Sequence, residues 1–331
     1  MADLLSLALA NLLSPPVLFF ALGIAAGFAR SDLAIPEQVA KGLSLYLLLA
    51  IGYKGGAAAA ANGLDAAFLA AIGLGLVLSC VMPLVAFAFL RGAKSIDRVT
   101  AAATAAHYGS ISIVTFVAAM DFAATAGLAP GSYLAAVAAI METPGIIVAL
   151  MLAGVSAATP QSPAKGHKVG FSAELLQEVL LNGSVVVLVG AFAIGVITGE
   201  RHMERLSVFM TGLFAGVLCL FLLEMGLVAA RRLQGRNRLT PYLVLCGLLI
   251  PVCGASLGLV GALALQMPPG DAMILMTLAA SGSYIAAPAA MRIALPEADA
   301  GVYLPLAIGV SFPFNIVIGI PLYAGIAEAL L

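Results

Sequence analysis

The stretch TLAASGSYIAAPAAMR, residues 277–292, interrupts a run that is otherwise apolar enough to cross a bilayer. Ser281, Gly282 and Ser283 stand in its middle, and Pro288 follows. Backbone N–H and C=O groups without partners cost several kcal/mol each in hydrocarbon. Irregular backbone therefore persists at that depth only where protein, water or a ligand satisfies it. The interruption marks a candidate binding site rather than a simple membrane span.

The composition of the whole chain places this stretch in a membrane protein. Of its 331 residues, 63% are hydrophobic and only 9% are charged, whereas about a quarter of a soluble domain is charged. A net charge of −1 gives no indication of nucleic-acid binding. Since about 20 apolar residues span a bilayer as a helix, the sequence predicts an all-α polytopic membrane protein with ten transmembrane helices, near residues 13–30, 40–61, 66–90, 99–122, 132–157, 175–198, 205–230, 240–265, 272–294 and 302–330.

The chain divides into two related halves. A Pro-, Ser- and Lys-rich linker, 156–172, separates residues 1–155 from residues 173–331. LLSPPVLFFALGIAAG, from residue 12, matches LLNGSVVVLVGAFAIG, from residue 180, and HYGSISIVTF (107–116) has a counterpart in SGSYIAAPAA (281–290). Matches in the same order indicate an internal repeat. Because five helices are an odd number, the second repeat enters from the opposite side, so we expect inverted repeats with helices four and nine broken at the membrane midplane.

The basic residues predict the orientation. Three lie on one face, Lys54, Arg201 and Arg205. The loops of the other face hold twelve: Arg30, Lys41, Arg91, Lys94, Arg98, Lys165, Lys168, Arg231, Arg232, Arg236, Arg238 and Arg292. Cytoplasmic loops carry the excess of Lys and Arg. We therefore expect a multi-pass protein of the bacterial plasma (inner) membrane, with both termini outside and the linker in the cytoplasm.

The two breaks predict an anion site and a neighbouring cation site. A half-helix N-terminus offers free N–H groups and about half a positive charge, so two of them meeting at the midplane bind an anion without Lys or Arg. The C-terminal ends of the first half-helices offer carbonyls that suit sodium. The candidate anion-binding residues are Gly109, Ser110, Ser112, Ser281, Gly282, Ser283 and Tyr284, and the candidate cation ligands are Thr115, Glu142 and Asn315.

Three ionisable residues lie well inside the segments, where by default they indicate function. Glu142 stands in METPG, where Pro144 frees a backbone carbonyl one turn earlier. A carboxylate beside that carbonyl suits a cation, while the alternative is a protonated, packing Glu142. Glu224 is interpreted as structural or as an interface residue. His107 is left open between capping carbonyls, sensing pH and filling space.

Close helix packing is a competing explanation for the same residues. Gly and Ser in both breaks suit close contact between helices as well as a binding site. Tyr284 and Asn315 suit either ligand binding or packing hydrogen bonds.

At these residues the chain resembles a known family. AHYGSISIVTF, METPGIIVALML, SYIAAPAAMRIALPEA and FPFNIVIGIPLY resemble the sodium-dependent bicarbonate transporter family over nearly the whole chain. The resemblance implies ten helices in inverted repeats, crossed broken helices four and nine, a homotrimer, and symport of bicarbonate with sodium. Cyanobacterial members are regulated by a small PII-like protein, which makes such a protein a candidate partner. Where those members carry Asp, this chain has Tyr284 in helix nine and Glu142 in helix five, which is typical of a non-cyanobacterial branch.

The leading hypothesis is a secondary active transporter that imports a small monovalent anion, with bicarbonate first, by sodium symport. The only cofactor expected is the co-transported sodium ion. The alternative is a sodium- or proton-coupled carrier of another small organic carboxylate. An enzyme is not expected, since no nucleophile and base occur at a recognisable spacing. A membrane sensor is disfavoured because no segment is long enough to fold as a soluble domain.

Overall fold

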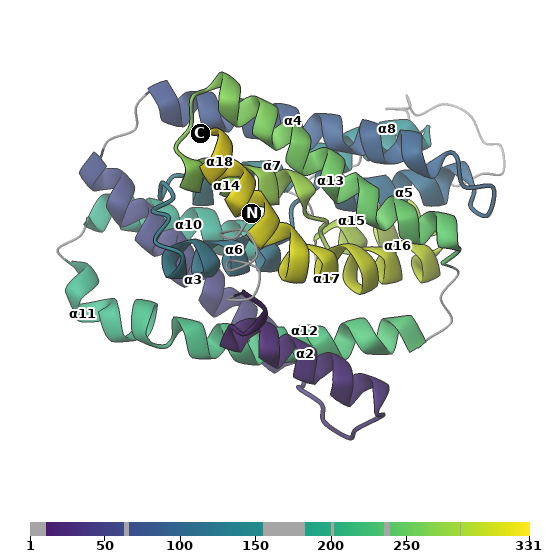
Figure 1. Ribbon diagram of the computed structural model, residues 1–331, viewed down its shortest axis with the longest axis horizontal. Helices are drawn as coiled ribbons and strands as arrows, with labels where there is room; N and C mark the ends of the chain where they lie inside the picture. Colours follow the sequence, from purple (N-terminus) through teal and green to yellow (C-terminus); the bar gives the residue numbers. More distant parts are fainter. Residues whose placement is uncertain (1–10, 63–65, 155–182, 200–201, 235–238, 285) are drawn as a thin grey trace.

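The computed structural model describes residues 11–62, 66–154, 183–199, 202–234, 239–284 and 286–331, and every regular element in these ranges is helical (Figure 1). The predicted class, an all-helical membrane protein, is confirmed. The linker at 156–172 lies outside the described residues.

The helices follow the apolar segments, with several interruptions. The first half contains α2 (Pro15–Phe28), α3 (Glu37–Asn62), α4 (Ala66–Leu90), α5 (Arg98–Gly109), α6 (Ile113–Thr125), α7 (Leu134–Met141) and α8 (Pro144–Ala153). The second half contains α10 (Gly183–Thr198), α11 (Met203–Ser207), α12 (Phe214–Gln234), α13 (Pro241–Ala264), α14 (Pro269–Ala280), α15 (Ala286–Ala294), α16 (Ala300–Leu306), α17 (Phe312–Phe314) and α18 (Ile320–Leu330). In the described ranges, three π-helical turns connect neighbouring elements: η2 (Val208–Gly212), η3 (Ala307–Ser311) and η4 (Asn315–Gly319).

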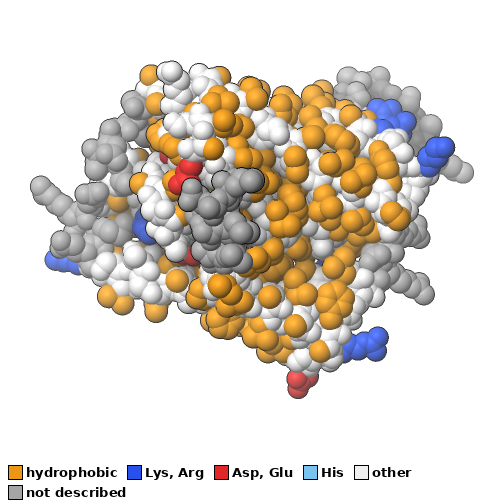
Figure 2. Space-filling model, in the orientation of Figure 1, with side chains coloured by type: hydrophobic (Ala, Val, Ile, Leu, Met, Phe, Trp, Pro, Cys, Tyr) orange, Lys and Arg blue, Asp and Glu red, His pale blue; other side chains and the backbone are white. Residues whose placement is uncertain are grey.

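The surface suits a bilayer. Among the described residues, six stretches are long and apolar enough to span one: Ala66–Leu90, Arg98–Thr125, Leu134–Ala153, Arg205–Gln234, Pro241–Ala264 and Ala300–Leu330. Figure 2 shows one face of the molecule largely covered by hydrophobic side chains, with Lys and Arg mostly at its margins. Large apolar side chains are exposed in water only at a cost, so this face indicates a lipid environment.

Two helix groups are distinguished by how their members pack. In the paired-helix group, α2 packs against α12 and α3 packs against α10; the four helices are labelled in Figure 1. Glycines allow both contacts. A Cβ added to Gly226 would lie 3.0 Å from the Cα of Gly23, and one added to Gly195 would lie 3.0 Å from the Cα of Gly56. The helix backbones therefore touch, which is how small residues drive association in membranes.

The crossed-helix group contains α4 to α8 and α13 to α18. Here α4 packs on α5 and α13 packs on α14, while α5 contacts α8 and α14 contacts α18. Besides the segments with the two predicted breaks, two further segments of this group are not continuous α-helices. Residues 132–157 divide at Glu142 and Thr143, because Pro144 lacks an N–H and its ring disfavours the preceding helical turn. The last segment contains two π-helical turns, near Pro305 and Pro313.

Candidate functional site

The break predicted in the fourth segment is present. Asp97 begins α5 by accepting a 2.7 Å hydrogen bond from the N–H of Thr100. The helix ends at Gly109, and Ser110 is extended. Ser112 then caps α6, its Oγ accepting a hydrogen bond from the Thr115 N–H at 3.2 Å. A side-chain oxygen at this position satisfies a donor that the new helix leaves free. The local sequence therefore ends one helix and starts another inside the span.

The ninth segment contains the corresponding break. The helix α14 ends at Ala280, Ser281 is extended, and α15 begins at Ala286. The Oγ of Ser283 accepts a hydrogen bond from the Ala287 N–H at 3.3 Å. Pro288 lies in the first turn of α15, where a missing N–H costs nothing.

The two breaks bond directly to each other. The Ser112 N–H donates to the Oγ of Ser281 at 2.9 Å. In return, the Ser283 N–H donates to the carbonyl of Ser110 at 3.0 Å and to that of His107 at 2.7 Å. Ser110 and Ser281 each follow a helix end directly, and Ser112 and Ser283 each lie two residues further on. Each break therefore satisfies the backbone of the other, through residues at matching positions.

The carbonyls that end the first half-helices also have partners. The Oγ of Ser79, on α4, lies 2.7 Å from the carbonyl oxygen of Gly109 and 2.9 Å from that of Met141, and its single proton is shared between these two acceptors. The Nδ2 of Asn315 donates to the carbonyl of Ala280 at 2.9 Å. These ends are therefore not the bare carbonyls that the sequence suggested. Each carbonyl oxygen keeps its second lone pair for a cation.

Asn315 is held from both sides. While its amide nitrogen bonds the end of α14, its Oδ1 accepts a hydrogen bond from the Tyr323 hydroxyl at 3.0 Å. Ser79 was missed by the sequence analysis. A single serine in an apolar helix gives no local signal, so only its contact with Gly109 identifies it.

The place where the two breaks bond to each other, formed by Ser110–Ser112 and Ser281–Tyr284, is called the crossing below. Glu142 lies against the crossing. It follows α7 at the bend before Pro144 and is buried, and its Oε2 has no hydrogen-bond partner among the described residues. A cleft with no room for a water-sized sphere is lined by Ile111, Ser112, Ile113, Glu142, Ser283 and Tyr284. Glu142 thus meets the first turn of α6 and the connection between α14 and α15, as the cation hypothesis requires. The cleft has to widen before it can hold an ion.

Only some of the predicted polar ligands are free. The hydroxyl of Ser281 donates to the Leu278 carbonyl at 2.9 Å, and that of Thr115 donates to the Oγ of Ser112 at 2.9 Å. By contrast, the Ser110 Oγ and the Tyr284 hydroxyl are buried without partners among the described residues. Both are available to a ligand without first breaking an internal bond. The hydroxyl protons of Ser112 and Ser283 are available too, because the oxygens of these serines only accept in the bonds described above.

The two predicted glycines of the breaks differ in role. A Cβ added to Gly109 would lie 2.7 Å from the Cα of Gly145, so Gly109 allows α5 and α8 to touch. A Cβ added to Gly282 would meet nothing closer than 3.6 Å. Close packing therefore explains Gly109 but not Gly282.

His107 packs beside the crossing in a fixed tautomer. Its Nδ1 lies 2.7 Å from the carbonyl of Ala103, which can only accept, so the proton is on Nδ1. Its ring packs against Tyr303 with centroids 4.8 Å apart, and its Nε2 has no partner among the described residues. The side chain does not line the cleft with Glu142.

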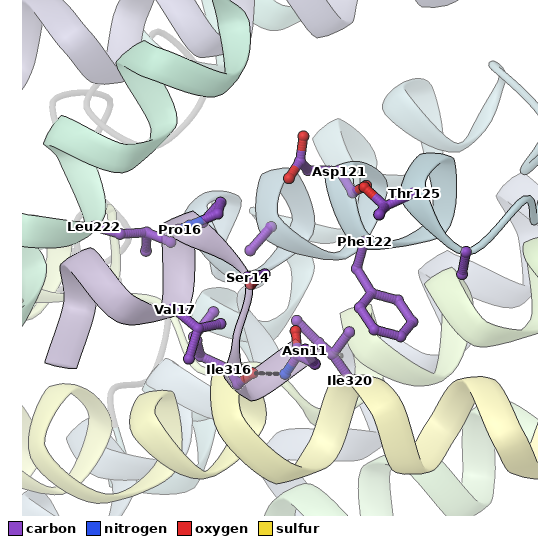
Figure 3. Close-up of a pocket in the computed structure, with 12 residues that line it drawn as sticks. Asn11, Ser14, Pro16, Val17, Asp121, Phe122, Thr125, Leu222, Ile316 and Ile320 are labelled. Atoms are coloured by element: carbon purple, nitrogen blue, oxygen red, sulfur yellow. Dashed lines mark hydrogen bonds between the residues drawn. The ribbon is translucent and has the colours of Figure 1, made fainter. Parts of the chain in front are cut away.

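A larger cavity of about 210 Å³ lies at the far end of α6, between α2, α12 and the α17–α18 region (Figure 3). The amide of Asn11 donates to the carbonyl of Ile316 at 2.9 Å on its wall. The other residues that line the cavity are mostly apolar. The lining includes the carboxylate side chain of Asp121, which points away from Asn11 (Figure 3). An apolar lining with a carboxylate and no Lys or Arg among its residues does not favour an anion. Asp121 was not predicted as a site residue from the sequence, because it stands at the edge of the predicted segment 99–122.

Comparison with known proteins identifies the family of the chain. None of the curated proteins compared with the chain matches it. A family model, that of the Na+-dependent bicarbonate transporter superfamily, matches residues 15–328. This is a family of transporters and not of enzymes. The resemblance seen in the sequence motifs is thus confirmed, and the chain belongs to the Na+-dependent bicarbonate transporter superfamily.

Proposed function

We propose that the protein imports bicarbonate together with sodium, and that both ions bind where the two breaks cross. The observation that carries this proposal is the reciprocal bonding of Ser112 with Ser281 and of Ser283 with Ser110. It brings the beginnings of α6 and α15 together within the membrane. Each helix N-terminus carries about half a positive charge. Together they offer an anion the equivalent of about one positive charge without a buried Lys or Arg.

Glu142 supplies the cation side of the proposed site. Its carboxylate lines the same cleft as Ser112, Ser283 and Tyr284, so a cation bound to it stands next to the anion. Either ion alone in this place is a poorly solvated charge. Each ion therefore tightens the binding of the other by the same factor, and this linkage is the physical basis of symport.

We further infer ten spans in two inverted repeats of five. The packing of the helices supports this arrangement. Under this arrangement α2, α3, α4, α5 and α8 of the first half have α10, α12, α13, α14 and α18 as their counterparts in the second half. Replacing each helix by its counterpart then turns the contact α2–α12 into α10–α3, α4–α5 into α13–α14, and α5–α8 into α14–α18, and all six contacts are present. The matched bonds at the crossing follow the same rule. A two-fold relation between the halves accounts for all of these pairings.

Assembly as a homotrimer, and regulation by a PII-like protein, remain predictions that rest on the family resemblance. The molar mass of the purified protein in detergent, measured by light scattering with the detergent subtracted, tests the trimer. Co-purification with an added PII-like protein, with and without nucleotide, tests the regulator.

Uptake of labelled bicarbonate into proteoliposomes tests the function. We expect uptake that follows an inward sodium gradient and disappears when choline replaces sodium. Unchanged uptake in choline would contradict sodium symport, and a response to an imposed proton gradient would then favour proton coupling. Competition by excess acetate or another small carboxylate, with no bicarbonate accumulation, would favour the alternative carrier of organic acids.

A further inference from the structure

The cleft at the crossing contains a tyrosine whose hydroxyl has no internal task. Tyr284 lines the cleft, its side chain is only 8% exposed, and its Oη bonds to no described residue. Its ring packs edge-on against the buried Phe312, with centroids 5.4 Å apart. A phenylalanine would make the same ring contact without an unsatisfied polar atom. Since nearly all buried polar groups are hydrogen-bonded, this hydroxyl calls for a reason, and a ligand in the cleft supplies one.

The helix N-termini at the crossing do not by themselves select bicarbonate. Their N–H groups donate hydrogen bonds and attract negative charge. They therefore serve any small anion whose oxygens accept hydrogen bonds, including nitrate and formate. Bicarbonate differs from these anions because one of its oxygens carries a hydrogen. A site that prefers bicarbonate has to accept a hydrogen bond from that O–H group.

The other polar side chains of the cleft have less capacity to accept this bond. The Oγ of Ser112 already accepts from the N–H of Thr115 at 3.2 Å and from its hydroxyl at 2.9 Å, so only the proton of Ser112 remains. The Oγ of Ser283 accepts from a backbone N–H of α15 at 3.3 Å and keeps one lone pair. The carboxylate of Glu142 is assigned to the cation. Tyr284 makes no internal hydrogen bond, so its oxygen is fully available as an acceptor.

We propose that the Tyr284 hydroxyl accepts a hydrogen bond from the O–H group of the transported anion, and that this contact selects bicarbonate over small anions without a hydroxyl hydrogen. This inference rests on the proposed transport of bicarbonate at the crossing. A site that bonds to a hydroxyl of its substrate discriminates strongly against analogues that lack it, because the buried partner is then left unsatisfied. The edge-on contact with Phe312 suits this role, since it limits where the ring and its hydroxyl can lie.

The test measures uptake of labelled bicarbonate into proteoliposomes at saturating sodium, with nitrate as the competitor, for the wild type, Tyr284→Phe and Tyr242→Phe. Tyr242 is exposed at the beginning of α13, where its hydroxyl donates to the carbonyl of Phe89 at 2.9 Å, so it is the matched control for the loss of a phenol hydroxyl. For Tyr284→Phe we expect a bicarbonate KM raised about tenfold, equivalent to about 1.4 kcal/mol. The inhibition constant of nitrate should change much less, because nitrate has no hydrogen to donate. Tyr242→Phe should keep the wild-type ratio of the two constants.

A measurement on the wild type alone keeps the inference testable if Tyr284→Phe folds poorly. The inhibition constant of nitrate should exceed the bicarbonate KM by at least about tenfold, and equal values would overturn the inference. An unchanged ratio of the two constants in Tyr284→Phe would overturn it as well, whether both constants stay the same or rise together. In either case, sodium-driven uptake of bicarbonate by the wild type would leave the proposed function intact. A wild type that takes up no bicarbonate would overturn both.

Discussion

The backbone N–H of Ser112 donates a 2.9 Å hydrogen bond to the side-chain oxygen of Ser281, across 169 residues of chain. Both residues are buried, and each belongs to the break of a different helix. The bond joins the two halves of the protein at the point where each interrupts its own helix. The serines of the two breaks therefore differ: the Oγ of Ser281 accepts a hydrogen bond within the protein, whereas that of Ser110 has no partner among the described residues.

Ser281→Ala should reduce stability. It leaves the Ser112 N–H without its acceptor in a buried place, at a cost of about 1–3 kcal/mol. Unfolding of the purified protein in detergent, followed against denaturant, measures the change. Ser256→Ala is the control, since Ser256 also donates to a backbone carbonyl, that of Val252 at 2.8 Å, but is exposed. Equal stability of the two variants would contradict a supporting role for Ser281.

Ser110→Ala should have the opposite effects: little change in stability and a higher KM for bicarbonate. The Ser110 hydroxyl is buried but bonds to no described residue, so its loss removes no internal hydrogen bond. A lost hydrogen bond to a charged ligand is worth about 1.5–3 kcal/mol, or roughly a ten- to hundredfold rise in the bicarbonate KM. Uptake kinetics at saturating sodium measure it. A KM equal to that of the wild type would remove Ser110 from the anion site.

Glu142→Gln should weaken the sodium dependence more than the binding of the anion. The substitution keeps the shape of the side chain but removes the charge that we assign to the cation side. Uptake is measured against sodium at several bicarbonate concentrations, with Glu328→Gln as the exposed control. We expect a clear rise in the half-saturating sodium concentration. Sodium curves that match those of the wild type would exclude Glu142 from the cation site.

Gly145→Ala should disrupt the crossing through packing alone. A Cβ at this position would overlap the backbone of Gly109, where α5 ends. Overpacking of this kind costs about 1–3 kcal/mol and should lower both stability and uptake. Gly73→Ala on α4 is the matched control, because its new Cβ would meet nothing within 4 Å. A Gly145→Ala protein as stable and active as Gly73→Ala would show that the two backbones can move apart freely.

The distribution of basic residues predicts the orientation in the membrane. With the four native cysteines replaced by alanine, a cysteine at Ser95 should be shielded from an impermeant thiol reagent in intact cells. A cysteine at Ala129 should react, because it lies in a loop of the opposite face. Both positions are exposed in the structure, so burial does not confound the comparison. The reverse labelling pattern would overturn the orientation.

Local residue chemistry was enough to predict the class of the protein and its interrupted helices. An apolar composition with few charges demands a bilayer, and Gly109, Ser110 and Ser281 end their helices much as the sequence indicates. The place of Glu142 before Pro144 also singled it out as a candidate, and the structure places it in the lining of the cleft. These features depend on neighbours in the chain, because helix termination and hydropathy are properties of short segments.

The partners of the broken ends were decided by the tertiary structure. Ser79 lies 30 residues before the carbonyl of Gly109 that it satisfies, and Asn315 lies 35 residues after that of Ala280. Which serine hydroxyls are free was settled in the same way. A hydrogen bond between helices requires two groups to meet within about 3 Å, and that distance depends on how whole helices pack. Composition and spacing along one segment do not contain this information. The sequence therefore predicted where the helices break, while the packing of whole helices determined which hydrogen-bond partner each polar group has there.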